Sequence, residues 1–441
     1  MSIIPKFKSI QQENTKVAWI DQVARSILFK KLDAIEHGYL QIYFNGVVYE
    51  FGDKDKQKHL HGVVYEFGDK DKQRHLHAVI YVHDVKTFRD IMLGGEPAAG
   101  KTYVQGGWSS KNLIAVIRLF TLNRAVLFSF KYGLGSLAKH IYSFKHRLRK
   151  NSQQGSKRNI QAHYDIGNDL YRLFLDNNMM YSSACFTSQQ DTLEKASKHK
   201  LKLICEKLAL QPSDHVLEIG SGWGGFAVYA SKNYGCQVTT TTISEEQYVY
   251  VKQRIEKNQL SNQITVLKKD YRELEGTFDK IVSIEMIESV GHQYLDEYFR
   301  VCNRLLKSTG VMLIQSITIS DYLYDHYLRS MDFIRKYVFP GGSLPSISAM
   351  LSSVARSTDM TLFHCESYAS SYAKTLEAWH QRFISNKEKV IELGYPNSFL
   401  RLWEYYLKYC QAGFEERVID VHHLVLKKPD NRFQTSSSSV L

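Results

Sequence analysis

The sequence contains no apolar run long enough to cross a bilayer, which takes a helix of about 20 residues. The best candidate, residues 112–130, is interrupted by Arg118, Asn123 and Arg124. The first residues lack the apolar core of a signal peptide. The six cysteines are scattered without a CxxC pair, so neither a metal site nor a disulfide framework is expected. These absences predict a globular cytoplasmic protein.

Acidic residues are in the minority, since the formal net charge is +12. A basic protein is attracted to polyanions, either nucleic acid or the anionic face of a membrane. Eight Lys and Arg residues and no acidic residue lie from Lys131 to Arg158, with apolar residues among them, as at a membrane surface or in a solvated linker. RNA binding would need basic residues combined with stacking aromatics, a pattern that the chain does not show. We therefore expect peripheral binding to the inner face of a membrane and no nucleic-acid partner.

Composition and hydrophobic pattern divide the chain into five segments. They are an arm (1–23), an α+β unit (24–130), a basic linker (131–158), a larger domain (159–429) and a Ser-rich tail expected to be disordered (430–441). In the α+β unit, strands are expected over residues 39–44 and 78–82, and Asp84 would begin a helix over residues 85–93.

Residues 46–61 recur as residues 62–77, with Lys58 against Arg74 as the single difference. Two copies are too few for a solenoid, which needs more repeats. We interpret the repeat as a tandem duplication of one strand and turn, in which either copy could complete a hairpin.

A phosphate-binding pattern, GxxxxGK[ST], is matched by residues 95–102 through Gly95, Gly100 and Lys101. Such a loop requires a buried strand before it and a helix after it. A helical pattern precedes this segment and Gly106-Gly107 follows it, so we interpret the match as chance.

The larger domain alternates apolar strands with helices, which predicts a mostly parallel α/β sheet of Rossmann-like type with helices on both faces. Strands are predicted over residues 216–219, 237–241, 264–267, 280–284 and 311–316. Helices are predicted between them, for example over residues 193–210 and 245–258.

The segment from Asp214 to Ala227 is a short strand that ends in Glu218, followed by four glycines and the start of a helix. Such glycines let the backbone approach a ligand closely at the carboxyl end of the first strand. The string also satisfies the dinucleotide pattern GxGxxG. However, Glu218 would repel a pyrophosphate, whereas it would attract the ammonium group of S-adenosylmethionine. The acidic ribose ligand expected about twenty residues further on is replaced by a run of threonines.

Several sequence blocks in the right order resemble the cyclopropane fatty acid synthase and mycolic acid methyltransferase family. They are VLEIGSGWGGFA from residue 216, QAHYDIGN from 161, YSSA from 181, ESVGH from 288, FPGGSLPS from 339, YAKTL from 372 and YYLKYC from 405. Residues 24–124 resemble the family's sterol-carrier-like N-terminal domain, most clearly in GKTYVQGGWSSKNLIAVIRLF. The resemblance implies an S-adenosylmethionine-dependent methyltransferase, membrane phospholipid substrates, contact of the smaller unit with lipid, and a homodimer.

The resemblance also implies where the methyl donor binds. Tyr181 and Ser182 would contact the donor from the side that covers it. Its methionine part would be lined by Gly220, Ser221 and Gly222, with Glu218 and Gly224 in the same loop. The ribose and adenine would be contacted by Thr242, Ile243, Gln247, Asp270, Tyr271 and Arg272.

The family's reaction adds a methyl group to a cis double bond, and the resulting carbocation must lose a proton before a ring can close. The site therefore needs a base and walls that exclude water. The resemblance implies that the base is a bound bicarbonate, held by Glu288 and Tyr372. The backbone at Ser183, the side chain of Gln315 and Ile317 would complete its pocket. An anion beside a carboxylate needs a shared proton, so Glu288 is expected to have a raised pKa.

Two positions depart from the family's commonest pattern: Ser183 stands where a Cys is usual, and Gln315 stands where a His is usual. Gln315 can donate a hydrogen bond to bicarbonate but cannot accept a proton. Cys410 corresponds to a cysteine once regarded as the family's active-site residue, although buried free cysteines are usually inert. These departures leave the product open between a ring and a methyl- or methylene-branched chain. A non-catalytic lipid-binding relative is the other alternative.

Overall fold

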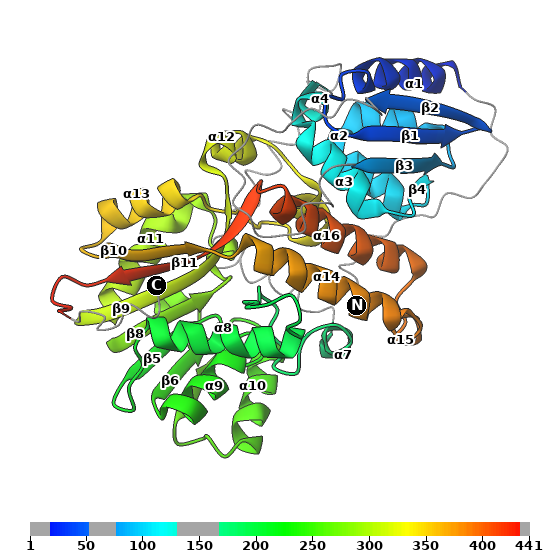
Figure 1. The fold of residues 1–441 in the computed structure, drawn as a ribbon. Helices are drawn as coiled ribbons and strands as arrows, with labels where there is room; N and C mark the ends of the chain where they lie inside the picture. Colours follow the sequence, from blue (N-terminus) through cyan, green and yellow to red (C-terminus); the bar gives the residue numbers. More distant parts are fainter. Residues whose placement is uncertain (1–17, 53–75, 130–166, 433–441) are drawn as a thin grey trace.

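The computed structural model describes residues 18–52, 76–129 and 167–432, which build two sheets (Figure 1). The basic linker, most of the second copy of the repeat, the block from residue 161 to 166 and both ends of the chain lie outside the described residues. The structure therefore does not bear on the predictions made for those segments.

The smaller unit contains a four-stranded sheet in the order β2-β1-β3-β4. Its elements are α1 (Trp19–Leu32), β1 (Tyr39–Phe44), β2 (Val47–Gly52), β3 (His77–Val82), α2 (Lys86–Val104), β4 (Trp108–Ser109), α3 (Leu113–Leu122) and α4 (Arg124–Ser129). Strands β1 and β2 form an antiparallel hairpin, and its turn residues Asn45 and Gly46 have positive φ angles of 50° and 76°. The strand predicted over residues 39–44 is confirmed, and the first copy of the repeat supplies β2.

Helix α2 is longer than the predicted helix over residues 85–93. The Lys86 N–H donates to the Asp84 carboxylate (2.9 Å), as expected at a helix start. Gly95 kinks the helix with a φ of 63°, and the helix then continues to Val104. The residues that match the phosphate-binding pattern thus lie inside a helix. Gly100 serves close packing instead, since a Cβ there would lie 2.2 Å from the Phe333 ring.

The larger sheet has seven strands in the order β10-β11-β9-β8-β5-β6-β7. All five predicted strands are present, with parallel pairing between neighbours. They are β5 (His215–Ile219), β6 (Gln237–Thr241), β7 (Ile264–Leu267), β8 (Phe278–Ile284) and β9 (Leu306–Ile319). Two further strands were not predicted, and they extend the sheet beyond β9 by antiparallel pairing. They are β10 (Thr361–Ser367) and β11 (Ile419–Lys427).

Helices cover both faces of this sheet. One face packs against α8 (Leu193–Lys207), α9 (Gly225–Tyr234) and α10 (Glu245–Lys257), and the other against α11 (Leu295–Leu305) and α13 (Ile347–Ser357). Adjacent strand residues alternate between the two cores, because side chains in a strand point to opposite faces. The mostly parallel α/β fold predicted from the sequence is confirmed.

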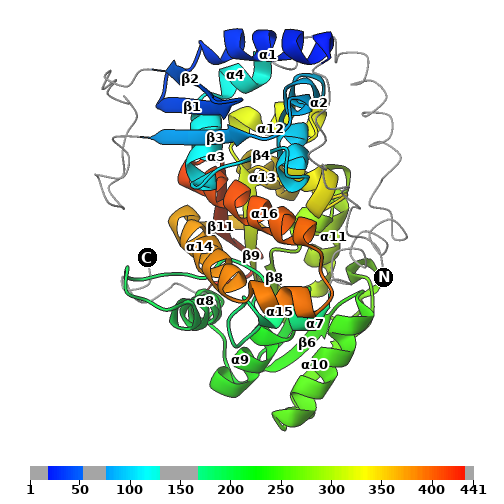
Figure 2. The ribbon, with the colours of Figure 1, turned by 90° about the vertical axis from the view of Figure 1, so that its right-hand side faces the viewer.

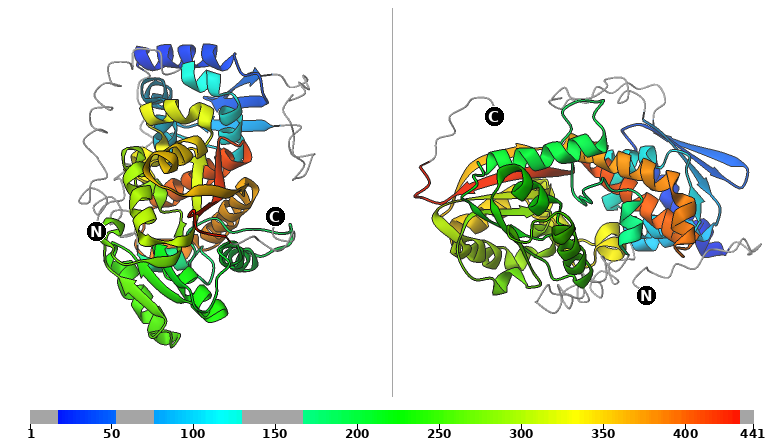
Figure 3. Two further views of the ribbon diagram at one scale, coloured as in Figure 1. Left: turned by 90° about the vertical axis from the view of Figure 1, so that its left-hand side faces the viewer. Right: turned by 90° about the horizontal axis from the view of Figure 1, so that it is seen from below.

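The smaller unit rests on α16 (Asn397–Glu415) of the larger domain, through α2 and α3 (Figure 2). The left view of Figure 3 shows the same stacking from the opposite side. Tyr103 donates a hydrogen bond to the Glu404 carboxylate (2.8 Å), and the Arg401 guanidinium donates to the Tyr103 carbonyl (2.7 Å). A single apolar core runs across this junction and includes Val116 of α3 and Trp403 of α16.

The remaining helices of the larger domain are α7 (Asn168–Arg172), α12 (Asp321–Arg329), α14 (Ala369–Ser385) and α15 (Lys387–Glu392). Within the described parts of the chain, no helix has both the length and the apolar character that a membrane crossing requires.

Candidate active site

The glycine loop lies where the connections of the larger sheet diverge. Strand β5 pairs with β6 on one side and with β8 on the other, so a crevice opens at its carboxyl end. The N–H groups of Gly220 and Ser221 donate to the Thr241 carbonyl (3.1 and 2.8 Å), which fixes the loop against the end of β6. Gly222 has a φ of 49°, a conformation that favours glycine.

A cavity of about 140 Å³ occupies this crevice, which we call the donor cavity. Its lining includes every residue predicted to contact the methyl donor except Gly224. The lining members are Tyr181, Ser182, Glu218, Gly220, Ser221, Gly222, Thr242, Ile243, Gln247, Asp270, Tyr271 and Arg272. Gly224 does not line it and begins α9 instead with a φ of 79°. A Cβ at Gly224 would lie 3.3 Å from Val251, so this glycine allows close packing of the loop on α10.

Local hydrogen bonds hold the predicted donor contacts in place. The Thr242 hydroxyl donates to the Gln247 side-chain oxygen (2.8 Å), while Ser244 caps α10 by accepting from the Gln247 N–H (3.3 Å). The Arg272 guanidinium donates to both carboxylate oxygens of Asp270 (2.8 and 2.7 Å). These hydrogen bonds fix the orientation of the side chains around the cavity.

Glu218 is a buried carboxyl group in the lining of the donor cavity. It is 3% exposed and accepts a hydrogen bond from the Thr240 hydroxyl (2.6 Å). Burial raises the pKa of Glu218 to about 8, because the carboxylate loses its hydration. A ligand ammonium group would compensate that loss. The buried carboxyl and the glycine cradle together fit S-adenosylmethionine.

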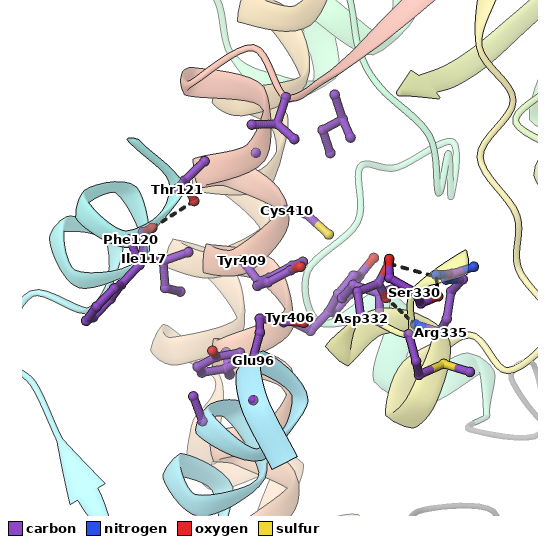
Figure 4. Close-up of a pocket in the computed structure, with 18 of the residues that line it drawn as sticks. Glu96, Ile117, Phe120, Thr121, Ser330, Asp332, Arg335, Tyr406, Tyr409 and Cys410 are labelled. Carbon is purple, nitrogen blue, oxygen red and sulfur yellow. Dashed lines mark hydrogen bonds and ion pairs between the residues drawn. The ribbon is translucent and has the colours of Figure 1, made fainter. Parts of the chain in front are cut away.

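A second and larger cavity of about 460 Å³ adjoins the first and is walled mainly by apolar side chains. Tyr181, Glu285 and Ser289 line both cavities. The larger one extends between the two units of the protein, and we call it the apolar cavity. Figure 4 shows Phe120 of α3 on one side of it, with Cys410 of α16 on another.

Three of the five residues expected to hold bicarbonate, Ser183, Gln315 and Tyr372, converge on the side chain of Glu285, a residue that was not predicted from the sequence. The Ser183 N–H and the Gln315 amide donate to one of its carboxylate oxygens (2.8 Å each). The Tyr372 hydroxyl donates to the other oxygen (2.6 Å). Glu285 follows β8 directly, and that position at the carboxyl end of a central parallel strand was the signal for a functional residue.

Glu288 lies one turn further along and contacts Ile317, another of the residues expected at the bicarbonate pocket. One of its carboxyl oxygens accepts from the Ile317 N–H (2.6 Å) and from the Ser316 hydroxyl (3.0 Å). Its other oxygen is buried without a hydrogen-bond partner among the described residues. Burial, followed by the neighbouring Glu285 carboxylate, raises the pKa of Glu288 to about 8. The predicted direction of this pKa shift is thus reproduced, and Glu288 is mainly a neutral acid at pH 7.

Further buried polar groups contact the residues around Glu285 and orient them. The Gln315 side-chain oxygen lies 2.9 Å from Nε2 of His423, and Nδ1 of His423 lies 3.4 Å from the Lys207 ammonium group. The fully buried Lys200 donates to the Ser182 hydroxyl (2.6 Å), and its positive charge acts to lower the pKa of Glu285.

Cys410, the remaining predicted residue, lies on the wall of the apolar cavity. Burial raises the pKa of its thiol above the usual range. A neutral thiol among apolar groups is poorly suited to act as a nucleophile, so its place in the wall is a matter of packing.

Comparison with known proteins agrees with this geometry. Residues 151–424 match the family model described as mycolic acid cyclopropane synthetase. The tuberculostearic acid methyltransferase UfaA1 of Mycobacterium tuberculosis is 34% identical, over 74% of this chain and 78% of its own length. The cyclopropane-fatty-acyl-phospholipid synthase of Escherichia coli is 35% identical, over 77% of this chain and 85% of its own length.

Among solved structures, the mycolic acid cyclopropane synthase CmaA1 complexed with SAH and CTAB is 32% identical, with a TM-score of 0.58. The match covers 62% of this chain and 98% of that one. The fold and the donor cavity thus define an S-adenosylmethionine-dependent methyltransferase. More narrowly, the chain belongs to the mycolic acid cyclopropane synthetase family, whose members alkylate lipids.

Proposed function

We propose that this enzyme alkylates the cis double bond of unsaturated phospholipid acyl chains and closes a cyclopropane ring. The observation that carries the proposal is the contact between the donor cavity and the apolar cavity at Tyr181, Glu285 and Ser289. A methyl group held in the first cavity would face an acyl chain held in the second.

The lining of the apolar cavity supports an acyl chain as the substrate. The smaller unit contributes Leu28, Ile42, Ile80 and Phe120, and the larger domain contributes Ile317 and Phe414. Burial of each CH₂ group of a chain in such surroundings stabilises the complex by about 0.8 kcal/mol. Apolar walls that exclude water would also protect a carbocation from hydrolysis.

S-adenosylmethionine supplies an electrophilic methyl group on a sulfonium centre. Glu218 would hold its ammonium group, and the glycine loop would approach its methionine part. Tyr181, whose hydroxyl lies 2.8 Å from that of Tyr406, would form part of the partition between donor and chain. A base must then remove one proton from the transferred methyl group. Three of the groups expected to hold bicarbonate, at Ser183, Gln315 and Tyr372, donate to the Glu285 carboxylate instead, so they do not form a vacant anion pocket.

The relatives favour one alternative product. Two relatives are named for different activities, one as a tuberculostearic acid methyltransferase and the other as a cyclopropane-fatty-acyl-phospholipid synthase. A methyl- or methylene-branched chain would result if the carbocation lost a different proton. A non-catalytic lipid-binding relative would lack methyl transfer altogether, and the complete set of polar groups around both cavities argues against it.

The proposal also covers where the enzyme binds and its oligomeric state. The net charge of +12 supports peripheral binding to an anionic membrane face from the cytoplasmic side, without a nucleic-acid partner. A homodimer stays a prediction from the family resemblance. Salt-dependent binding to anionic vesicles but not to RNA would support the membrane assignment.

The test is mass spectrometry of fatty acids from cells that express the protein. The expected result is a gain of one CH₂ unit per unsaturated chain, in a product that resists mild hydrogenation as a ring does. The control is Gly220→Val, whose side chain would enter the donor cavity, because even a Cβ at that position would lie 3.0 Å from the Met286 side chain. If no chain gains mass although the purified protein binds S-adenosylmethionine, the lipid assignment is wrong.

A further inference from the structure

We propose that Glu285 is the base of this reaction and that its carboxylate takes the place of an added bicarbonate. The inference rests on the proposed lipid alkylation and identifies the group that receives the proton. It concerns a residue that is part of the chain, so the enzyme would need no external anion.

Three hydrogen-bond donors surround the carboxylate of Glu285. The Ser183 N–H, the Gln315 amide and the Tyr372 hydroxyl all donate to its two oxygens, at 2.6 to 2.8 Å. A planar oxyanion of this size is what bicarbonate would present to the same groups. Since the carboxylate already satisfies all three donors, a bicarbonate ion could enter only by displacing a covalently attached side chain.

The backbone of Glu285 is in the left-handed region, with a φ of 50°. Residues with a side chain seldom adopt this left-handed conformation, and glycine adopts it freely. A glutamate at such a position is disfavoured by the local backbone and is stabilised by the contacts of its side chain. Strain of this kind is concentrated at functional sites.

The position of Glu285 between the two cavities also favours it as the base. Glu285 lines the donor cavity and the apolar cavity together, so it faces the place where a methyl group would pass from one to the other. Glu288 lines only the apolar cavity and is directed to the Ile317 N–H. Of the two carboxyl groups, Glu285 therefore lies nearer the path of the methyl group.

The groups around Glu285 and Glu288 also affect which of the two carboxyl groups is ionised. The buried Lys200 and the three hydrogen-bond donors favour the ionised form of Glu285, while desolvation raises its pKa above the ordinary value. The neighbouring Glu288, with a pKa of about 8, stays mainly protonated at pH 7. One carboxylate and one carboxylic acid side by side give the site a base without a second negative charge.

The step is balanced without a further reactant. One alkene carbon forms a bond to the methyl carbon as the bond from that carbon to sulfur breaks, and S-adenosylhomocysteine is released. The positive charge then resides on the other alkene carbon. Glu285 takes a proton from the new methyl group, and the electron pair of that C–H bond forms the third side of the ring. Glu285 returns its proton to water after the product leaves.

The experiment compares the purified wild type with Glu285→Gln, Glu285→Gly and the exposed control Glu275→Gln. Each is assayed on dioleoyl phosphatidylglycerol vesicles in CO₂-free buffer, with and without added bicarbonate. Calorimetry with S-adenosylhomocysteine reports whether the donor cavity is intact in each variant. Binding of ¹³C-labelled bicarbonate, followed by NMR, reports whether an anion pocket is present. Glycine fits the φ of 50° without strain, so the Glu285→Gly variant is expected to fold.

We expect the wild type and Glu275→Gln to form the ring equally fast with and without bicarbonate. Glu285→Gln should lose at least about 100-fold in rate, the usual contribution of a general base, and bicarbonate should not restore it because the amide fills the pocket. Glu285→Gly should be slow, should bind labelled bicarbonate and should be accelerated by it. All variants should bind S-adenosylhomocysteine as the wild type does.

Two results would overturn the assignment: a wild type that depends on added bicarbonate, or a Glu285→Gln variant that keeps the wild-type rate. A different result would point at the proposed function. If the wild type binds S-adenosylhomocysteine but alkylates no vesicle lipid under either condition, the lipid reaction is wrong and the assignment of its base falls with it.

Discussion

Three glutamates at the ends of β5 and β8 have different tasks because their surroundings differ. Glu218 is nearly inaccessible and has one hydroxyl partner, Glu285 has three donors, and Glu288 has one oxygen without a partner among the described residues. Desolvation raises the pKa of each. The number and charge of the groups around a carboxyl decide which form it takes at neutral pH.

The first prediction concerns Glu218. In the folded protein it keeps its proton up to about pH 8, whereas in the unfolded chain it loses it near the ordinary value of 4.5. The folded state therefore binds more protons in this window, and the stability of the donor-free protein should fall as pH rises from about 4.5 to about 8. Glu218→Gln cannot ionise, so its melting temperature should fall less over the same window, as measured by calorimetry.

The same variant should bind S-adenosylmethionine more weakly, because the ammonium group loses its carboxylate partner. The exposed Glu273→Gln serves as the control and should change neither property. Parallel melting curves of Glu218→Gln and the wild type across this pH range would contradict the predicted pKa of about 8.

The second prediction concerns Cys410. Its thiol has a raised pKa and should react slowly with thiol reagents at neutral pH, whereas Cys365 is exposed and should react first. Cys410→Ala should keep the rate of alkylation, since the side chain contributes only part of the apolar cavity wall. Peptide mapping after treatment with a thiol reagent would check the first point, and a lipid assay would check the second. Loss of ring formation in Cys410→Ala would restore this cysteine as a catalytic candidate.

At the scale of elements, the unpredicted strand β11 carries His423, which orients the side chain of Gln315 in the active site. It pairs antiparallel with β9 in a register that places His423 opposite Gln315. Burial lowers the pKa of His423 well below its ordinary value, so the ring is neutral and its Nε2–H donates to the Gln315 oxygen. This contact turns the amide NH₂ of Gln315 toward Glu285.

The third prediction follows from this arrangement. In His423→Ala the Gln315 amide is free to rotate, so Glu285 loses a donor and its pKa should rise further. A hydrogen bond to a charged group stabilises it by about 1.5–3 kcal/mol, so the acidic limb of the pH–rate profile should move up by about one to two units. The matched control is His422→Ala, since the neighbouring His422 contacts Thr318 instead. An unchanged acidic limb in His423→Ala would show that Gln315 does not tune Glu285.

At the scale of the molecule, the apolar cavity exists only because two units pack together. Helices α2 and α3 of the smaller unit lie against α16, and both units contribute to the cavity wall. The donor cavity, in contrast, is lined entirely by residues 179–290 of the larger domain. Damage at the junction should therefore affect the lipid and spare the methyl donor.

The fourth prediction tests that separation. A Cβ at Gly100 would meet the Phe333 ring at 2.2 Å and the Tyr405 ring at 2.8 Å, so Gly100→Ala should force α2 away from the larger domain. Overpacking of this kind lowers the free energy of unfolding by about 1–3 kcal/mol. The KM for lipid vesicles should rise while the affinity for S-adenosylhomocysteine stays the same. Leu93→Ala, at an exposed position on α2, should change neither value. Equal weakening of both ligands would contradict the division of roles between the units.

The sequence by itself determined the elements whose signals are local. Runs of apolar and β-branched residues located all five parallel strands, and the side chains of β5, β6, β8 and β9 are mostly buried. The glycine loop and the residues after β6 and β7 were also predicted, since the carboxyl ends of parallel strands meet at one edge. Strand β10 was missed because it is an edge strand with mostly exposed side chains, and β11 was missed because Asp420, His422 and His423 interrupt its apolar run.

Only the tertiary structure decided which carboxylate occupies the reactive position. Glu285 and Glu288 are three residues apart in one segment, and nothing local distinguishes them as partners of Tyr372. The choice is made by donors distant in sequence: the pairing of β8 with β9 brings Gln315 to Glu285, and the Ser183 N–H, 132 residues before Gln315, reaches the same carboxylate. The apolar cavity likewise depends on the docking of the smaller unit on α16. Contacts of this range arise from packing, which no single stretch of the chain encodes.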